Sequence, residues 1–246
     1  AFELLGLLSS ENNNFVFRGG SSLLLLLPDL NRLSIDIDIV IPINTFDFQK
    51  MISKSRFIRV EISNRPASRV PKTHYKFFYN SIINKKEHYV LLDIFESEIH
   101  YDKLLLRKIE NNLFETESEI FVKIPSTDNL LADKLTAFAP NTIGIPFGKN
   151  KSMEIIKQLF DLSILFDETE SIESIRKTYR RIQTVESQYR EIFYSFNECL
   201  DDTFSVASKL CSIDLKGVND DNEITELRNG IKSISNFLFS KKYYLF

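Results

Sequence analysis

The segment that most constrains the fold of this chain is an alternation of isoleucine and aspartate over residues 35–39. In a β-strand, side chains two residues apart lie on the same face, about 7 Å apart along the chain. The isoleucines would therefore face a hydrophobic core, while Asp36 and Asp38 would share the opposite face. Two carboxylates this close repel each other unless a cation lies between them. Oxygen ligands of this kind suit Mg²⁺, which proteins usually hold with one or two carboxylates and substrate phosphates. The alternative is a half-exposed strand with acidic residues on its solvent side, and the triplet by itself favours that alternative.

A Gly-Gly-Ser-Ser turn at residues 19–22 precedes this strand and makes a binding site more plausible. A short strand is predicted over residues 15–18, and a leucine-rich helix over residues 23–30, with one of the two serines as its N-cap. Glycine lets the backbone approach a ligand closely, and a helix N-terminus offers free N–H groups to phosphate. A simple strand-to-helix turn is the alternative, and two glycines alone favour it.

Composition limits the class of protein. The chain has 246 residues, of which 43% are hydrophobic and 26% charged, enough for one large globular domain or two modest ones. The net charge of −3 excludes a general basic field, so any nucleic-acid site must be a local patch. Two cysteines form no disulfide framework, and the three histidines lack metal-ligand spacing, which argues against zinc. The longest apolar run, residues 23–27, is too short to cross a bilayer, and the N-terminal segment is expected to be an amphipathic helix.

The hydrophobic pattern predicts an α+β region over residues 1–125 and a helical region over residues 126–246. The predicted strands beyond residue 18 are 33–41, 57–62, 74–79, 88–95 and a strand ending near 124. The predicted helices are 1–10, 23–30, 47–55, 127–139, 153–166, 171–187, 189–211 and 222–240.

Asp93 lies within an apolar strand, HYVLLDIF, where a lone carboxylate is costly to bury. It could lie at a sheet edge or pair with a nearby lysine. It could instead be a third carboxylate that strand pairing brings beside Asp36 and Asp38, and the acidic strand upstream favours this second interpretation.

Two further charges lie on helices of the second region. Lys134 falls on the buried stripe of TDNLLADKLTAFA, where a lysine needs a charge partner unless its ammonium reaches solvent at the margin of the stripe. Asp161 follows Lys157 by four residues, so it forms either an intrahelical salt bridge or a contact that orients Lys134 or the nucleotide.

The segment IRKTYRRIQ places four cations on one side of a helix, Arg176, Lys177, Arg180 and Arg181. Such a run is usually a solvated face. It is nevertheless the best local candidate for a contact with an RNA backbone.

Taken together, FVFRGGSSLLLL, RLSIDIDIV, LLADKLTAF and KQLFDLSIL resemble, in order and spacing, the AbiEii/AbiGii-type nucleotidyltransferase toxins of the DNA polymerase β-like superfamily. The resemblance spans residues 15–166. It implies a nucleotidyltransferase fold, a mixed β-sheet flanked by helices, followed by a C-terminal helical bundle. Residues 1–125 would form the nucleotidyltransferase core, and residues 126–246 would contribute Lys134 and Asp161 to the cleft. The chain begins close to the first motif, so an N-terminal piece is either absent or short.

The resemblance also assigns roles residue by residue. Gly20 and Ser21 match the turn that holds the triphosphate, and the S-x-D-x-D motif supplies two metal ligands. The implied nucleotide-binding residues are Gly19, Gly20, Ser21, Ser34 and Lys134. The implied metal ligands are Asp36, Asp38 and Asp93, and the implied catalytic set adds Lys134 and Asp161 to these three. One departure is Gln158, which replaces the first acid of the family's K-D-h-h-D segment; we expect that position to act indirectly.

The implied activity is metal-dependent transfer of NMP from an NTP, with Mg²⁺ or Mn²⁺, to a tRNA 3′ end in the cytoplasm. A cognate antitoxin is the implied partner, and no membrane is involved. Transfer to a protein or a small molecule is the alternative within enzymes. A catalytically silent module that binds nucleotide or RNA is the alternative outside them, although an idle site would be free to lose its clustered carboxylates.

Overall fold

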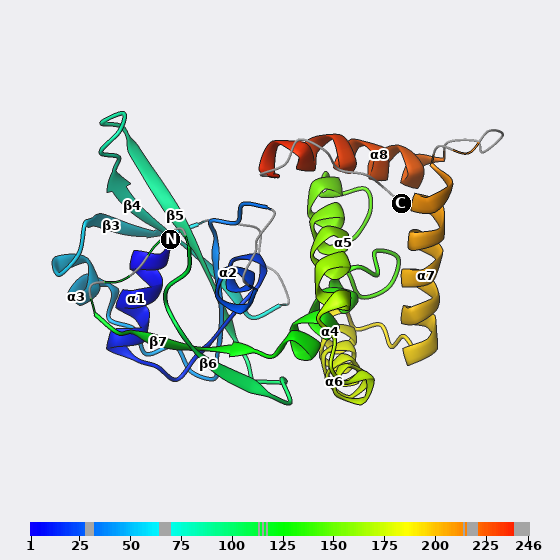
Figure 1. Ribbon diagram of the computed structural model, residues 1–246, viewed down its shortest axis with the longest axis horizontal. Helices are drawn as coiled ribbons and strands as arrows, with labels where there is room; N and C mark the ends of the chain where they lie inside the picture. The colour runs from blue at the N-terminus through cyan, green and yellow to red at the C-terminus, as the bar shows by residue number, and fades with distance from the viewer. Residues whose placement is uncertain are drawn as a thin grey trace. The chain divides into compact units, whose positions relative to one another are not determined.

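The computed structural model describes residues 1–27, 32–63, 70–112, 114, 116, 118–213, 215 and 221–238. The chain divides into two compact units, Ala1–Ser126 and Thr127–Phe246. The described strands lie in the first unit, and helices α4 to α8 lie in the second (Figure 1). Each unit is described separately below.

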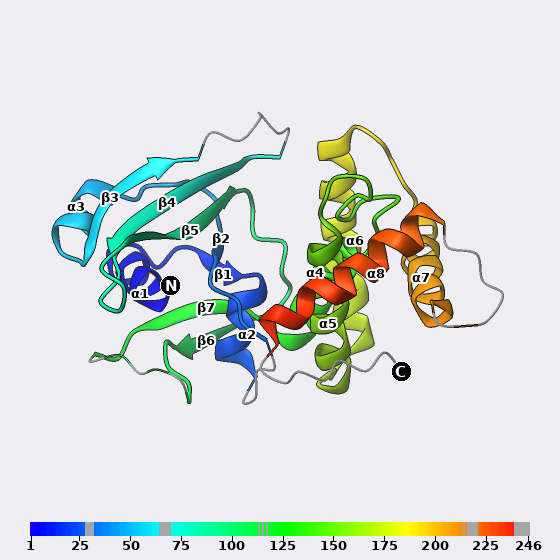
Figure 2. The same cartoon turned by 90° about the horizontal axis from the view of Figure 1, so that it is seen from above.

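The first unit is built on a mixed sheet, which has seven strands in the described residues, in the order β3-β4-β5-β2-β1-β7-β6 (Figure 2). The strands are β1 (Val16–Arg18), β2 (Ile37–Ile41), β3 (Phe57–Ile62), β4 (Lys72–Asn80), β5 (Glu87–Glu96), β6 (Leu104–Lys108) and β7 (Phe121–Pro125). The helices of this unit are α1 (Phe2–Glu11), α2 (Leu23–Leu26) and α3 (Phe48–Ser53), and a 3₁₀ turn covers Gly20–Ser22. Pairing is parallel between β2 and β5 and between β1 and β7, and antiparallel elsewhere.

The two faces of the central strands differ in chemistry. On one face, Ile37 and Ile39 of β2 and Leu92 of β5 join a fully buried core that includes leucines of α1 and Met51 of α3. Burying each such side chain contributes roughly 1.5–3 kcal/mol, so the core firmly sets which way these strands face. Because side chains alternate along a strand, the aspartates of β2 and β5 must lie on the other face.

Two boundaries in this unit correct the sequence-based expectation. The helix predicted over residues 23–30 ends at Leu26, and Leu27 is extended, with φ −109° and ψ 141°. Pro28 follows, and a proline disfavours the helical conformation in the residue before it; residues 28–31 lie outside the described residues. The strand predicted over residues 33–41 begins at Ile37. Its partner β1 ends at Arg18, opposite Asp38, because Gly19 turns the backbone away with a positive φ of 77°.

The second unit contains α4 (Thr127–Ala137), α5 (Ser152–Asp167), α6 (Ile172–Arg190), α7 (Phe196–Ser212) and α8 (Asn222–Ile234). Helix α4 packs against both α5 and α6, and α5 packs against α8. The helix predicted over residues 189–211 starts later, because α6 continues to Arg190 and ends where Glu191 adopts a left-handed conformation. Helix α7 begins after Ser195, which forms a capping box with Glu198. Helix α8 ends at Ile234, earlier than the predicted residue 240.

Gly230, in the middle of α8, provides a test of this packing. A Cβ atom there would lie 2.4 Å from the carbonyl oxygen of Ser152 and 2.6 Å from Cγ1 of Ile156, both on α5. Gly230→Ala is expected to lower the free energy of unfolding by about 1–3 kcal/mol, because α8 must move away from α5. Urea denaturation followed by circular dichroism measures the loss. The exposed neighbour Asn229→Ala should change stability by less than about 0.5 kcal/mol. Equal stability of the two variants would contradict the close approach of the helices.

Candidate active site

Asp38 and Asp93 stand side by side on the solvent-facing side of the sheet. The parallel pairing of β2 with β5 sets these two residues directly opposite each other. The Asp93 carboxylate is buried, and that of Asp38 is about one-third exposed. We call Asp38 and Asp93 the carboxylate pair. The arrangement concentrates negative charge at one point and therefore requires compensation nearby.

That compensation comes from β4. The ammonium of Lys72 lies 2.6 Å from Oδ2 of Asp93 and 3.4 Å from Oδ1 of Asp38, so it bridges the pair. Nδ1 of His74 lies 2.6 Å from the other oxygen of Asp93, and it is the donor because a carboxylate oxygen only accepts. Burial disfavours the charged lysine, but Asp38 and Asp93 together outweigh burial and raise the pKa of Lys72 above its ordinary value. Asp93 thus has both features that its sequence context suggested as alternatives, a carboxylate neighbour and a lysine partner.

Sequence reasoning did not include Lys72 or His74 among the site residues. They lie two residues apart on β4 and therefore on the same face of the sheet. The antiparallel register sets His74 opposite Asp93 and Lys72 opposite Phe95. The available signal was a lysine and a histidine two residues apart at the start of a strand. Nothing local in the sequence says which residues of β5 they would face.

The glycine-serine turn packs directly against the acidic segment. A Cβ atom at Gly19 would lie 2.5 Å from Oδ2 of Asp38, so only glycine leaves room for that carboxylate. The Ser21 hydroxyl donates to the main-chain carbonyl of Asp36 at 2.5 Å and lies 3.0 Å from the Ser34 hydroxyl. The structure thus brings together the turn and the S-x-D-x-D segment that the sequence predicts to act together.

Gly20 lies against Arg32, a residue that sequence reasoning did not single out. A Cβ atom there would lie 2.4 Å from a guanidinium nitrogen of Arg32, which is almost fully buried. Arg32 donates to the carbonyl of Leu33 at 3.1 Å. The guanidinium therefore lies under the glycine-serine turn, within the same compact segment.

Asp36 differs from the carboxylate pair. It is exposed and precedes the first residue of β2. It lines a cavity of about 580 Å³ together with Tyr79, His88 and Tyr89. Within the described ranges, no group of three or more His, Cys, Asp or Glu side chains is arranged to hold a metal ion. A metal-binding role for Asp36 stays a prediction.

Lys134 and Asp161 meet inside the second unit. The Lys134 ammonium lies 2.6 Å from Oδ2 of Asp161 and donates to Oε1 of Gln158 at 3.3 Å. Their side chains are only 5% and 0% exposed, so this is a dry ion pair. Of the two alternatives for Asp161, the structure supports a contact with Lys134. The ammonium of Lys157 lies over the ring of Phe237, 4.4 Å from its centre.

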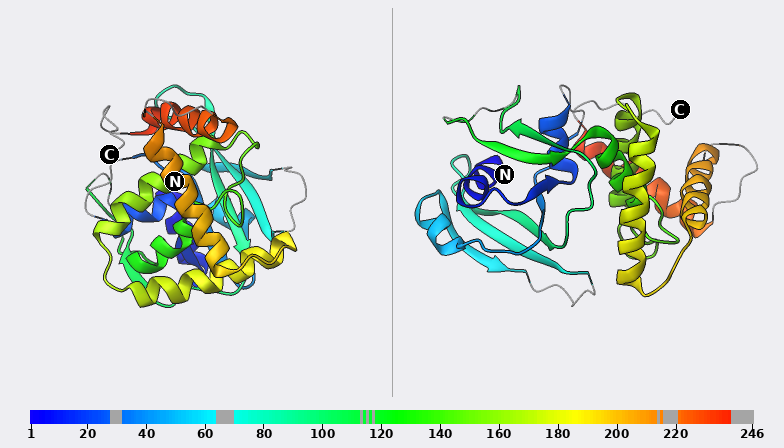
Figure 3. Two further views of the ribbon diagram at one scale, coloured as in Figure 1. Left: turned by 90° about the vertical axis from the view of Figure 1, so that its right-hand side faces the viewer. Right: turned by 90° about the horizontal axis from the view of Figure 1, so that it is seen from below.

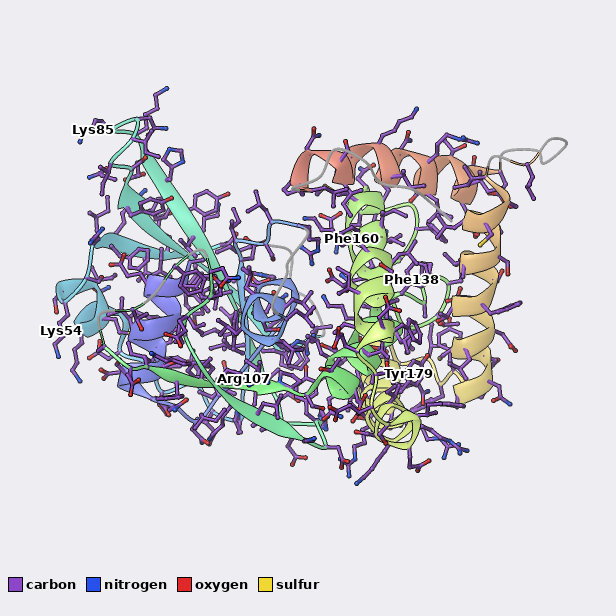
Figure 4. All side chains as sticks on the ribbon, in the orientation of Figure 1. Lys54, Lys85, Arg107, Phe138, Phe160 and Tyr179 are labelled. Atoms are coloured by element: carbon purple, nitrogen blue, oxygen red, sulfur yellow. The ribbon has the colours of Figure 1, made fainter. Side chains whose placement is uncertain are left out.

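The four cations predicted as an RNA contact occupy the exposed side of α6, the long yellow-green helix of Figure 3. Arg180 also lies over the ring of Phe196, at 4.8 Å. The opposite side of α6 carries Tyr179, which is buried (Figure 4). The exposure of these cations is compatible with an RNA contact, and the contact itself stays a prediction.

A glycine-serine turn packed against the segment that carries Asp36 and Asp38, with Asp93 on the adjacent strand of a mixed sheet, is the arrangement that the resemblance to nucleotidyltransferases led us to expect. The model of the family described as "Nucleotidyl transferase AbiEii toxin, Type IV TA system" matches residues 4–233. The chain therefore belongs to the AbiEii toxin family, and it is a nucleotidyltransferase.

Two solved structures from Helicobacter pylori are similar to this chain. The crystal structure of JHP933 has 18% identity and a TM-score of 0.44, covering 95% of this chain and 89% of JHP933. A second protein, provisionally described as a nucleotidyltransferase, has 12% identity and a TM-score of 0.38, covering 78% of this chain and 96% of its own. No curated protein sequence matches. In the part of the chain that the structure describes, none of the helices has the length and apolar character needed to cross a membrane.

Gly19 allows the geometry of the turn to be tested against a matched glycine. Gly19 and Gly148 both have a positive φ, but a Cβ atom at Gly148 would meet nothing within 4 Å. Alanine at either position should lower the free energy of unfolding by about 1–3 kcal/mol through backbone strain. Only Gly19→Ala also displaces Asp38, so it alone should reduce nucleotide transfer, by roughly 100-fold. Calorimetry and a transfer assay measure the two effects. Equal activity of both variants would contradict the contact between the turn and Asp38.

The buried ion pair leads to a prediction about stability. Lys134→Met leaves the Asp161 carboxylate buried without its ammonium partner and should cost about 3–5 kcal/mol. The double variant Lys134→Met/Asp161→Asn removes both charges and should recover most of that loss. Chemical denaturation of both variants and the wild type measures the difference. A single substitution costing less than about 1 kcal/mol would show that Asp161 is not a dry, paired carboxylate.

Proposed function

We propose that the protein transfers NMP from an NTP to a tRNA 3′ end in a reaction that requires a divalent metal. The observation that carries the proposal is the carboxylate pair lying directly against the glycine-serine turn. This combination offers anionic oxygens for a cation beside a backbone that can approach phosphates closely. Membership of the AbiEii toxin family supports the same chemistry.

The residues of the pair fit a magnesium or manganese ion. Both donors are carboxylate oxygens, and Mg²⁺ is commonly held by one or two carboxylates plus substrate phosphates. The bridging ammonium of Lys72 supports this fit, because it marks the place between Asp38 and Asp93 where positive charge is stabilised. Asp36, two residues from Asp38, is the proposed third ligand. When bound, the metal would neutralise phosphate charge and align the attacking hydroxyl with the α-phosphorus.

The chain's own groups would bind and orient the nucleotide. The backbone of Gly19, Gly20 and Ser21 can lie against the triphosphate, because the two glycines present no side chain there. Ser34 supports the turn through its contact with the Ser21 hydroxyl. Lys134 is proposed to bind the nucleotide phosphates and stabilise negative charge on the leaving pyrophosphate, which requires its ammonium to emerge from the dry pair with Asp161 when the nucleotide binds.

Asp93 is the proposed acceptor of the proton from the attacking hydroxyl. Each of its oxygens has a contact from β4, one with Lys72 and one with His74. Each oxygen keeps a second lone pair that could take the proton, and loosening the Lys72 contact would make that oxygen more basic. The His74 contact keeps the carboxylate oriented if Lys72 is the one that leaves.

The exposed cations of α6 are the proposed contact with the tRNA backbone, through the residues Arg176, Lys177, Arg180 and Arg181. A cognate antitoxin is the proposed protein partner, as expected for a toxin of this family, and the proposed location is the cytoplasm.

Transfer of label from each α-labelled NTP, with Mg²⁺ and total tRNA, tests the function. Asp38→Asn and Asp93→Asn should each lower the rate at least 1,000-fold, because each removes an anionic ligand from the proposed metal. Glu61→Gln is a matched control, since it removes a carboxylate from an exposed position on β3 and should leave the rate within twofold. Chelation with EDTA should abolish transfer in all variants.

The molecule that receives the labelled nucleotide distinguishes the proposed tRNA acceptor from a protein or small-molecule acceptor and from a module that only binds nucleotide. Label that appears on tRNA and is lost in Asp38→Asn supports the proposal. Label on a protein or a small molecule instead would overturn the choice of acceptor while leaving the chemistry intact. Nucleotide binding without any transfer would overturn the proposed reaction.

A further inference from the structure

We propose that Lys72 is a resident counter-ion that keeps the carboxylate pair closed to free divalent cations, and that it leaves the pair when a nucleotide triphosphate offers it new partners. The inference rests on the proposed function, because it concerns how the metal–nucleotide complex reaches Asp38 and Asp93. It assigns to Lys72 a positioning role that neither family membership nor sequence pattern indicates.

The competition follows from the distances. The Lys72 ammonium lies 2.6 Å from Oδ2 of Asp93 and 3.4 Å from Oδ1 of Asp38. A magnesium ion requires oxygen ligands at about 2.1 Å. Two cations cannot occupy the space between the same two carboxylates, since their mutual repulsion is large where little water separates them. A metal that bridges the pair must therefore displace the ammonium.

Lys72 is placed so that it can be displaced. It is the first residue of β4, and its side chain is 31% exposed, so its ammonium can move into solvent by rotation of side-chain bonds. Lys134 is a useful contrast, because its side chain is only 5% exposed and its ammonium is enclosed with Asp161. The first lysine can exchange partners, whereas the second is confined.

The surrounding charges favour movement of the Lys72 ammonium from the carboxylate pair to a phosphate. Arg18 stands opposite Asp38 on β1, and its positive charge disfavours a second cation at the pair. His74 remains on Asp93 when Lys72 leaves, so the carboxylate keeps a partner and its orientation. A triphosphate lying against the glycine-serine turn would bring several anionic oxygens close to the freed ammonium. Free metal brings no anion, so it must displace Lys72 without compensation.

The expected consequence is an order of binding. Metal alone should bind the pair weakly, and metal accompanied by triphosphate should bind well. When neither metal nor triphosphate is bound, Lys72 offsets part of the repulsion between Asp38 and Asp93 and so stabilises the folded strands.

Titration with Mn²⁺, followed by the electron paramagnetic resonance of the free ion, tests this without an activity readout. With no nucleotide present, full-length Lys72→Met should bind Mn²⁺ at least tenfold more tightly than the wild type. Lys72→Arg keeps the positive charge and should match the wild type. The melting temperature of Lys72→Met should rise with added Mn²⁺, whereas that of the wild type should stay nearly constant.

Equal Mn²⁺ affinities of the wild type and Lys72→Met would overturn the proposal. Lys72→Gln, whose amide can still donate to Asp93, replaces the methionine variant if the latter does not fold. Equal affinities together with metal-dependent transfer would overturn only the role of Lys72. Mn²⁺ binding by no variant, together with transfer that survives EDTA, would overturn both this inference and the metal requirement of the proposed function.

Discussion

Parallel pairing between β2 and β5 places two carboxylates next to each other, and the repulsion between them governs the surrounding structure. The pairing is stabilised from the other face of the sheet, where isoleucines of β2 and apolar residues of β5 are buried in the core. Hydrophobic burial thus holds Asp38 against Asp93 despite the electrostatic cost. The neighbouring strands then compensate, since β4 supplies Lys72 and His74 and the turn after β1 supplies a glycine that leaves room. The same strands thus supply the core with one face and the candidate site with the other.

Among the residues that the structure describes, two lysine–aspartate contacts measure 2.6 Å, and they differ in what they can do. The contact of Lys134 with Asp161 is dry, so breaking it leaves an uncompensated charge in a medium where charge is costly. That contact serves to fix an ammonium in one position. In the contact of Lys72 with Asp93 the carboxylate is buried but the lysine side chain is 31% exposed, so the ammonium can exchange its partner at lower cost. That contact suits a site that must admit a charged ligand.

Local patterns predicted part of this arrangement and long-range pairing determined the rest. The Ile-Asp alternation correctly indicated that Asp38 faces away from the core and that Ile37 and Ile39 are buried, whereas Ile35, which precedes the strand, is exposed. The position of Asp93 beside Asp38 was predicted from the acidic strand upstream. Lys72 was not identified, because its place depends on a strand register between β4 and β5 that no local signal specifies. The early end of α2 was not predicted, although Pro28 disfavours a helical conformation in the residue before it. The assigned catalytic and metal-binding roles stay predictions.

The departure of this chain from the family pattern at Gln158 has a physical interpretation. An acid at that position would place the Lys134 ammonium between two carboxylates, leaving a net negative charge in a nearly dry environment. Glutamine still accepts a hydrogen bond from Lys134, at 3.3 Å, but adds no charge. The buried group then consists of one cation and one anion, which is the less costly arrangement where desolvation is severe. With glutamine, the ammonium still has two oxygen partners, one from Gln158 and one from Asp161. What is lost is the repulsion that a second carboxylate would exert on Asp161. We therefore expect the substitution to preserve the position of Lys134, and the family acid to be dispensable here for holding that lysine.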